Sequence, residues 1–300
     1  MRMPILILLI AGSLPAETLI LKRAWIESFK DRATIDAAFF IDHAHKHPNA
    51  PADDGDIHVA GRAPKEIGLP MVAEVMNAAG GLEKGAVDLI HANEGNGKST
   101  PITGAWRLWF EHPAPSVTQF DPVPVASNTN PDHCFEIHPI TKYGGQDISG
   151  SLDFVPGFPA HDAASSFGSY EKMSITMKAT ATAVTMDAKK SGFNYALFHI
   201  KLLGKPTKLS DGGLAVLADV FDAKDTETAL ASKIRMIFLP GTGPATLLGK
   251  GAGDGTEFDA MGIPRLNLNA ISTFLKAAGT ASSTRKLPYE MIVVALKAVK

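Results

Sequence analysis

A chain of 300 residues with 45% hydrophobic and 20% charged residues has an ordinary globular composition, which permits one large domain or two of common size. Its 27 glycines and 20 prolines favour short strands and turns over a helix bundle. The net charge of -2 excludes a general electrostatic attraction for nucleic acid, and the single cysteine, Cys134, excludes an intramolecular disulfide.

The first 16 residues have the pattern of a signal peptide. Met1-Arg2-Met3 provides a positive start, residues 4–10 form a short apolar core, and Ser13 and Ala16 are small residues near which a peptidase could cut. This apolar run is shorter than the ~20 residues that span a bilayer, and no later segment is long and apolar enough. We therefore predict export to the periplasm, cell envelope or exterior, with no membrane span. The alternative is a buried amino-terminal strand that continues through residues 17–21.

Strand signals dominate residues 25–142. The expected strands cover residues 34–41, 56–61, 70–76, 100–110 and 135–140, with residues 86–90 as a strand or short helix. About five strands in so short a block, with few helical signals, predict a small closed β-barrel of the OB type.

Residues 143–170 are rich in turn formers and lack sustained periodicity, so we predict a linker there. Residues 171–300 then form a second β-rich domain, either a barrel or a sandwich. Its expected strands cover residues 173–186, 193–201, 214–220, 234–239 and 265–271, followed by a last strand or helix at 288–298. The two blocks show no residue-level repeat that would indicate duplication. The second block carries no cluster of histidine and carboxylate, so we expect it to serve as a scaffold or as the surface of a homo-oligomer.

Four short segments of the first block resemble a known group of proteins. In chain order they are Asp54-Gly55-Asp56-Ile57-His58-Val59, residues 71–75, Ile102-Thr103-Gly104 followed by His112, and Phe135-Glu136-Ile137-His138-Pro139-Ile140. These segments resemble secreted bacterial proteins with an acidic-Gly-Asp-x-His strand, a glutamate strand and a Glu-x-His-Pro strand. The resemblance covers residues 35–142 and implies an OB-like fold, without implying an activity. Residues 106–109 depart from the group, which has an acidic residue near that place.

Eight of the ten histidines lie between His43 and His138, and most of them are close to a carboxylate. Side chains alternate across a strand, so Asp56 and His58 share one face of their strand, as Glu136 and His138 do on theirs. With Glu74 and His112 added, these groups can converge on one site. A mixed set of nitrogen and oxygen ligands suits zinc, manganese or iron better than calcium.

We therefore predict metal-assisted hydrolysis, such as that of a phosphoester, with Asp56, His58, His112 and His138 as metal ligands. Glu74 or Glu136 would be the general base. The alternative for the same side chains is a structural or envelope-assembly role, in which they bond to one another and order the barrel.

A third hypothesis is a binding module without turnover. Arg107 and Trp109 fall on the strand face opposite Trp106, and they could stack on the rings of an oligosaccharide, a nucleic-acid strand or a small molecule. Packing of Arg107 and Trp109 against each other at the surface is the simpler account of the same pair.

Overall fold

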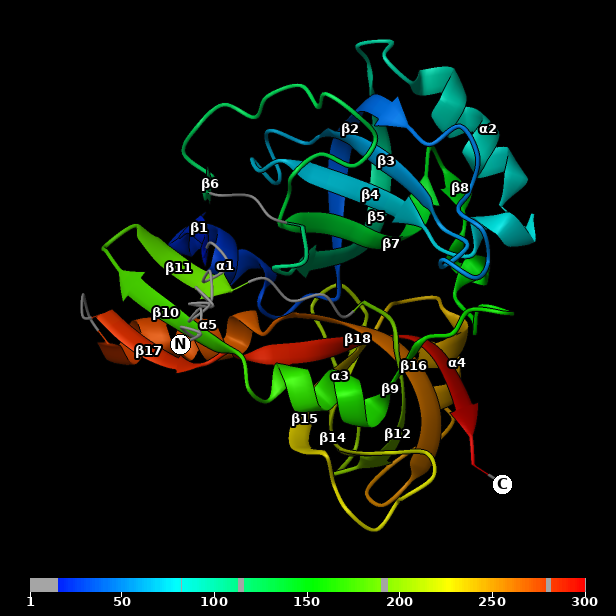
Figure 1. Cartoon of the computed structure of the whole chain (residues 1–300), viewed down its shortest axis with the longest axis vertical. Coiled ribbons are helices and arrows are strands. Elements are labelled where there is room, and N and C mark those ends of the chain that lie inside the picture. The colour runs from blue at the N-terminus through cyan, green and yellow to red at the C-terminus, as the bar shows by residue number, and fades with distance from the viewer. Residues whose placement is uncertain (1–15, 82, 113–115, 190–193, 279–281, 300) are drawn as a thin grey trace, which may run out of the picture.

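The computed structural model of the chain describes residues 16–81, 83–112, 116–189, 194–278 and 282–299. The predicted signal peptide, apart from Ala16, lies outside the described residues. No helix within these ranges is long and apolar enough to cross a membrane. The fold is mainly β and is built around two closed barrels, one above the other in Figure 1.

The first barrel has five strands in the order β4-β3-β2-β5-β7, and a parallel pairing of β4 with β7 closes it. The strands are β2 (Thr34–Ala44), β3 (Ile57–Arg62), β4 (Met71–Val75), β5 (Ser99–Leu108) and β7 (Phe135–Tyr143). Helix α2 (Lys84–Asn93) and the short η1 (Ala78–Gly80) lie between β4 and β5, and β8 (Gln146–Asp147) pairs with the end of β7. A closed five-stranded barrel of this kind is an OB-fold, which confirms the predicted fold of the first block.

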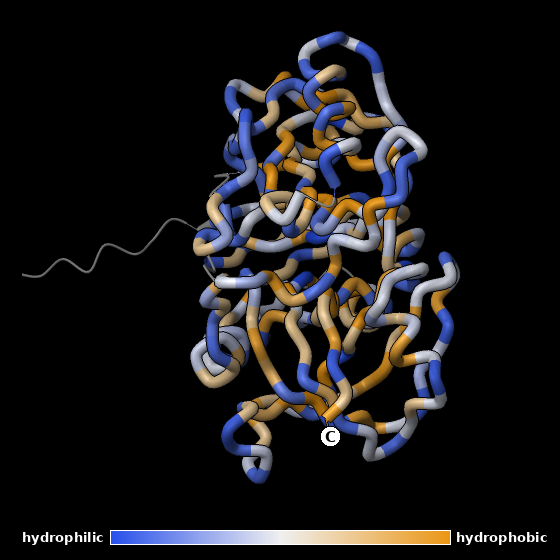
Figure 2. The backbone as a smooth tube through the Cα atoms, turned by 90° about the vertical axis from the view of Figure 1, so that its right-hand side faces the viewer, coloured by the Kyte–Doolittle hydropathy of each residue, from blue (hydrophilic) through white to orange (hydrophobic). Residues whose placement is uncertain are grey.

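The second barrel repeats this topology. Its strands run in the order β14-β15-β18-β16-β12, and β12 pairs with β14 to close it. They are β12 (Ala196–Leu202), β14 (Leu214–Phe221), β15 (Ala231–Phe238), β16 (Glu257–Leu266) and β18 (Tyr289–Ala298), with helix α4 (Gly243–Leu248) between β15 and β16. The third strand is again parallel to the fifth, and two short strands, β9 (His161–Asp162) and β13 (Thr207–Lys208), extend the sheet. In both halves the hydrophobic segments run through the interior (Figure 2).

The predicted strand at residues 265–271 is wrong. Strand β16 ends at Leu266, and helix α5 (Leu268–Ala278) follows it. The Asn267 side chain accepts a hydrogen bond from the backbone N–H of Ala270, which is how a helix N-cap residue stabilises the first turn. The buried side chains then recur with helical spacing, at Leu268, Ile271 and Leu275.

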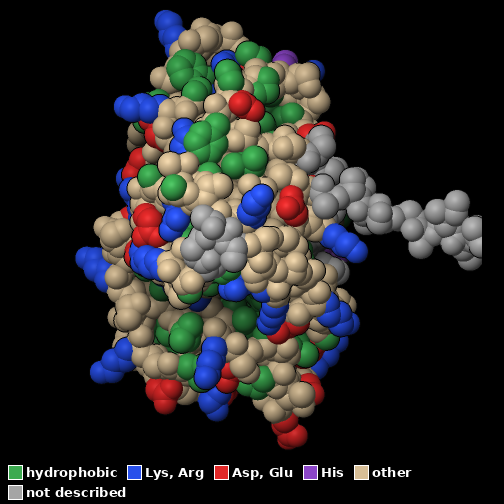
Figure 3. Space-filling model, turned by 90° about the vertical axis from the view of Figure 1, so that its left-hand side faces the viewer, with side chains coloured by type: hydrophobic (Ala, Val, Ile, Leu, Met, Phe, Trp, Pro, Cys, Tyr) green, Lys and Arg blue, Asp and Glu red, His purple; other side chains and the backbone are tan. Residues whose placement is uncertain are grey.

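A third sheet joins the two barrels. It contains β17 (Ser282–Lys286), β10 (Ser174–Ala179), β11 (Ala183–Lys189), β1 (Ala16–Lys22) and β6 (Ser116–Thr118), in that order. Strand β6 comes from the connection between β5 and β7, and β17 from the matching connection in the second barrel. Helix α1 (Arg23–Phe29) packs against α5 beside this sheet. On the face that includes this sheet, basic and acidic side chains are interspersed (Figure 3).

The segment expected to be a linker contains regular structure. Besides β8 and β9 it holds η2 (Ser149–Ser151) and helix α3 (Ala163–Tyr170). The Asp162 side chain caps α3 by accepting a hydrogen bond from the N–H of Ser165 (2.8 Å), and Phe167 and Tyr170 are buried. Residues 163–170 are therefore part of the core rather than a flexible connection.

The pairing registers show a residue-level repeat that the sequence does not make evident. Arg107 on β5 lies opposite Glu136 on β7, and Arg265 on β16 lies opposite Glu290 on β18. Both arginines belong to a Gly-x-x-Arg-Leu segment, residues 104–108 and 262–266. The two barrels therefore correspond at this Arg–Glu pair, although the β5–β7 register has an irregularity between Gly104 and Trp106 that the matching part of β16–β18 lacks.

Candidate functional site

Five of the six side chains predicted to converge meet inside the first barrel, all but His112. Asp56 precedes β3, His58 lies on β3 opposite Glu74 of β4, and Glu136 and His138 lie on β7 beside β4. Because β4 bridges β3 and β7, the period-two spacing of each strand brings these groups to one place. Four of them are at most 3% exposed, while the His58 side chain is 13% exposed.

His138 is the centre of this cluster. Its Nε2 lies 3.3 Å from Asp56 Oδ2, and its Nδ1 lies 3.3 Å from Glu136 Oε2 and 3.5 Å from Glu74 Oε2. His58 Nε2 is 3.4 Å from the same Glu74 oxygen. Imidazole and carboxylate groups thus alternate from the edge of the barrel into its interior.

Tyr195, just before β12 of the second barrel, completes the cluster. Its hydroxyl donates a hydrogen bond to Asp56 Oδ2 (2.5 Å) and accepts one from His138 Nε2 (2.6 Å). The backbone N–H of Asn77 donates to the other Asp56 oxygen (2.7 Å). No spacing in the sequence indicates Tyr195, because it comes from the other barrel.

Burial and neighbouring charges separate the protonation states of this cluster. Burial raises the pKa of Glu74 to about 8. Burial also disfavours the charged form of Glu136, but Arg107 and the nearby histidines hold the pKa of Glu136 well below its ordinary value. Burial lowers the pKa of His58. Burial also acts to lower the pKa of His138, but the neighbouring carboxylates of Glu74, Asp56 and Glu136 outweigh it and raise this pKa well above its ordinary value. At neutral pH Glu74 and His58 are therefore neutral, whereas Glu136 and His138 are charged. Such a division of protonation states is typical of acid–base sites.

A second group lies on the other side of Glu136. His133 Nδ1 donates a hydrogen bond to the carbonyl of Pro131 (2.6 Å), and His133 Nε2 lies 3.4 Å from Glu136 Oε1. The His112 ring stacks on the His133 ring with a centroid distance of 4.5 Å. His133 is 1% exposed, yet its Nε2 makes no hydrogen bond to any described residue.

Two sets of described residues could each hold a metal ion. Asp56, Glu74 and His138 form one set, and His112, His133 and Glu136 form the other, with ligand atoms within 4.8 Å of one another in each. His58 belongs to neither set. The predicted ligand His112 is thus in a different set from Asp56 and His138, and Glu136 of the second set also contacts His138 of the first.

The expectation of an exposed Arg107 and Trp109 is wrong. Arg107 is fully buried: it donates hydrogen bonds to Glu136, to Glu111 Oε2 (2.6 Å) and to the carbonyl of Pro264 in the second barrel (3.0 Å). Trp109 is 2% exposed and packs edge-on against Tyr170 of α3. The packing of the second half of the chain against this strand face leaves no ring surface for a ligand.

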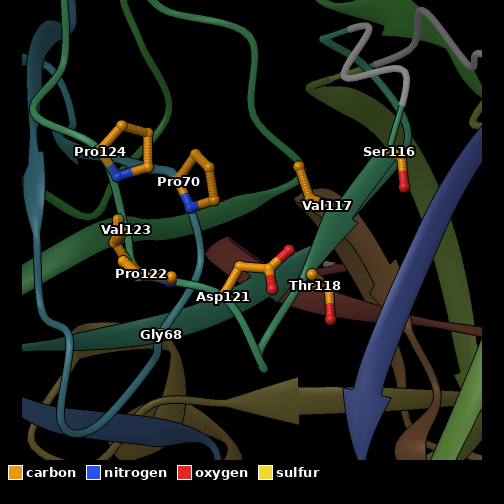
Figure 4. Close-up of a pocket in the computed structure, with 9 residues that line it drawn as sticks. All are labelled: Gly68, Pro70, Ser116, Val117, Thr118, Asp121, Pro122, Val123 and Pro124. Atoms are coloured by element: carbon orange, nitrogen blue, oxygen red, sulfur yellow. The ribbon is translucent and has the colours of Figure 1, made fainter.

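The surface cavity drawn in Figure 4 is separate from these clusters. It has a volume of about 210 Å³ and lies between the β3–β4 connection and the segment from β6 to Pro124. Its lining includes Pro70, Pro122 and Pro124, with Asp121 between Pro122 and Thr118, and none of the histidines named above.

The second barrel does contain a histidine–carboxylate group, contrary to expectation: the buried His199 of β12 lies 3.1 Å from Asp259 Oδ1 and 3.6 Å from Glu257 Oε2. This group lies at other positions than the cluster of the first barrel.

The two barrels can be aligned on Glu136 and Glu290, and His138 then corresponds to Ile292. The parallel pairings of β4 with β7 and of β15 with β18 place Ile237 at the position of Glu74, and the pairing of β14 with β15 places Ala215 at that of His58. An OB barrel of this register therefore closes with apolar side chains at these positions. The polar set of the first barrel is not a requirement of the fold.

The fold and the site together define a protein of two OB barrels with a buried histidine–carboxylate centre in the first. No family model matches the chain, and no curated protein matches it. Among solved structures, a deletion mutant of the single-stranded DNA binding protein from Thermus aquaticus aligns over 89% of this chain and 93% of its own, at 5% identity and a TM-score of 0.24. A likeness this weak supports no argument about function.

Proposed function

We propose that this protein binds a divalent transition-metal ion through His112, His133 and Glu136 and uses it to hydrolyse an ester bond. The observation that carries the proposal is the Nε2 atom of His133, which is buried and makes no hydrogen bond to a described residue. Glu136 Oε1, 3.4 Å away, forms an ion pair with this nitrogen but no hydrogen bond, so its burial costs free energy that a bound ion would offset. Because Nδ1–H is held by the Pro131 carbonyl, Nε2 is the atom that can ligate an ion, as in metal-bound histidines. Although burial acts to lower it, the neighbouring Glu136 raises the pKa of His133, so binding an ion must displace the Nε2 proton.

Two imidazoles and one carboxylate are a ligand set that suits zinc, manganese or iron. Catalytic zinc sites of this composition keep a fourth position for water, and the ion lowers the pKa of that water. His112 is half-buried, so the set reaches the surface at this residue. His133 Nε2 and Glu136 Oε1 are 3.4 Å apart, which matches the ~3.4 Å between two ligands that lie ~2.1 Å from a tetrahedral ion.

The other set fits an ion less well. The Tyr195 hydroxyl occupies the space between Asp56 Oδ2 and His138 Nε2 and satisfies both atoms. An ion bound to these two atoms would have to displace it. We therefore propose that Asp56, His58 and His138 support the site rather than ligate the metal, and that Glu136 is a ligand rather than the general base.

Metal binding is tested by elemental analysis of the purified chain and by calorimetric titration of the chelator-treated protein with Zn²⁺, Mn²⁺ and Fe²⁺. Replacing even a group that only orients a ligand costs 10–100-fold in affinity, so His133→Ala should weaken binding by at least about 100-fold. The control is His161→Ala, which changes an exposed histidine of β9. Hydrolysis of a chromogenic phosphodiester should require the metal and should be lost in His133→Ala. A parent protein that binds none of the three ions, or a His133→Ala variant that binds them equally well, would contradict the proposal.

A further inference from the structure

The two barrels are joined by a reciprocal pair of hydrogen bonds. Tyr195, just before β12, donates to Asp56, in the loop that leads into β3. Thr34, at the start of β2, donates through its hydroxyl to Asp211 Oδ2 (2.8 Å), in the loop that leads into β14. Ile35 pairs with Gly104 and Ala196 pairs with Gly262, so Thr34 and Tyr195 hold the same position in their barrels.

The two contacts differ in whether the hydroxyl that donates to the aspartate also binds a second polar side chain. The Tyr195 hydroxyl also binds His138, whereas the position that corresponds to His138 in the second barrel is Ile292. The Thr34 contact therefore serves only to join the barrels. The Tyr195 contact continues into the polar interior of the first barrel.

A continuous series of contacts leads from Tyr195 to the candidate ligands. The Tyr195 hydroxyl lies 2.6 Å from His138 Nε2, and His138 Nδ1 lies 3.3 Å from Glu136 Oε2. Arg107 binds this same Glu136 oxygen. The other oxygen, Oε1, is left facing His133 Nε2 at 3.4 Å.

From this geometry we infer that Tyr195, a residue of the second barrel, is a positioning residue for the metal site of the first. The tyrosine hydroxyl fixes the orientation of the His138 ring, and the ring and Arg107 together hold Glu136 with Oε1 directed toward His133, where the ion would bind. Partners that orient a metal ligand in this way contribute about 10–100-fold to metal affinity in other proteins. The inference rests on the proposed metal site, and it assigns the second barrel a part in that site.

The matched variants are Tyr195→Phe and Thr34→Val. Each removes one hydroxyl that joins the barrels, and each keeps a side chain of similar size. In Tyr195→Phe the ring still packs edge-on against Phe158, with a centroid distance of 5.4 Å, so the variant should fold. We expect both variants to melt below the parent protein, because each leaves a carboxylate with one hydrogen bond fewer.

Only Tyr195→Phe should change the metal site. The expected results are a Zn²⁺ dissociation constant about tenfold higher than that of the parent and shifted visible absorption bands of the Co²⁺-loaded protein. Thr34→Val should retain the parent affinity and spectrum. Equal loss of affinity in both variants would show general loosening of the interface and would overturn the inference, as would a Tyr195→Phe variant with the parent affinity and spectrum. A parent protein that binds no metal would instead refute the proposed function, and this inference with it.

Discussion

At the residue scale, the environment of each ionisable group decides its chemistry more than its type does. Glu74 and Glu136 both face Nδ1 of His138, yet only Glu136 is also bound by a guanidinium, that of Arg107. The consequence is that Glu74 keeps its proton at neutral pH while Glu136 is ionised. A carboxyl that is protonated at neutral pH fits the role of an acid better than the base expected from the sequence.

The raised pKa of Glu74 predicts a pH-dependent stability. The folded carboxyl keeps its proton up to about pH 8, whereas the ordinary value is 4.5. Between these values the folded chain binds more protons than the unfolded chain, so the free energy of unfolding falls as the pH rises. Glu74→Gln should flatten this dependence between about pH 5 and pH 8, as measured by urea denaturation. Glu227→Gln, at an exposed position before β15, should keep the parent slope; a Glu74→Gln variant with that same slope would contradict the assignment.

At the element scale, alternation along the strands predicted most of both barrels. Strands β2, β3, β4, β5 and β7 all lie within a few residues of their predicted ranges, and residues 86–90, left as strand or helix, belong to α2. The same spacing brought Asp56, His58, Glu74, Glu136 and His138 together. Strand spacing could not identify His133 as a site residue, because His133 lies just before β7. Its ring is positioned by a hydrogen bond to the Pro131 carbonyl rather than by alternation along a strand.

Gly104 offers a test of the close approach between β5 and β7. A Cβ atom at this position would lie 2.5 Å from both Ile137 Cγ2 and the carbonyl oxygen of Pro139. Gly104→Ala should therefore reduce the free energy of unfolding by about 1–3 kcal/mol, the usual cost of overpacking. Gly168→Ala is the control, since a Cβ there meets nothing within 4 Å and alanine favours helix α3. Equal stability of the two variants in urea denaturation would show that the strands are less tightly packed than described.

At the scale of the whole molecule, buried polar groups join the barrels. Arg265 binds Glu290 (2.7 Å) within the second barrel, reaches the carbonyls of Ala33 (3.0 Å) and Trp106 (3.1 Å) in the first half, and lies 3.5 Å from the centroid of the Trp106 ring. Arg107 makes the reciprocal contact to Pro264. The third sheet adds strands from both halves of the chain. The barrels should therefore unfold together.

Arg265→Met should uncouple the barrels. The variant removes one of the two arginines that bind the buried Glu290 carboxylate and leaves Arg235 as the other. Breaking a buried ion pair in this way typically costs about 3–5 kcal/mol. Trp25, Trp106 and Trp109 all lie in the first half of the chain, so their fluorescence reports on that half and on its contact with Arg265, while circular dichroism follows both barrels. The two denaturation curves should coincide for the parent and for Arg285→Met, an exposed control, and should separate for Arg265→Met. Coincident curves in Arg265→Met would show that this arginine does not couple the barrels.

The sequence by itself determined the β-rich fold, the first OB barrel and the convergence of five polar side chains, because alternation within a strand and short connections are local properties of the chain. Tertiary structure alone decided the partners of those side chains. Tyr195 enters the cluster from the other barrel, Arg107 is buried by contact with Pro264, and His133 faces Glu136 across a turn. The Tyr195 and Arg107 contacts join segments whose relative placement depends on how the barrels pack, and no local pattern encodes that packing. The His133 contact is local, but it depends on the turn before β7 rather than on strand alternation.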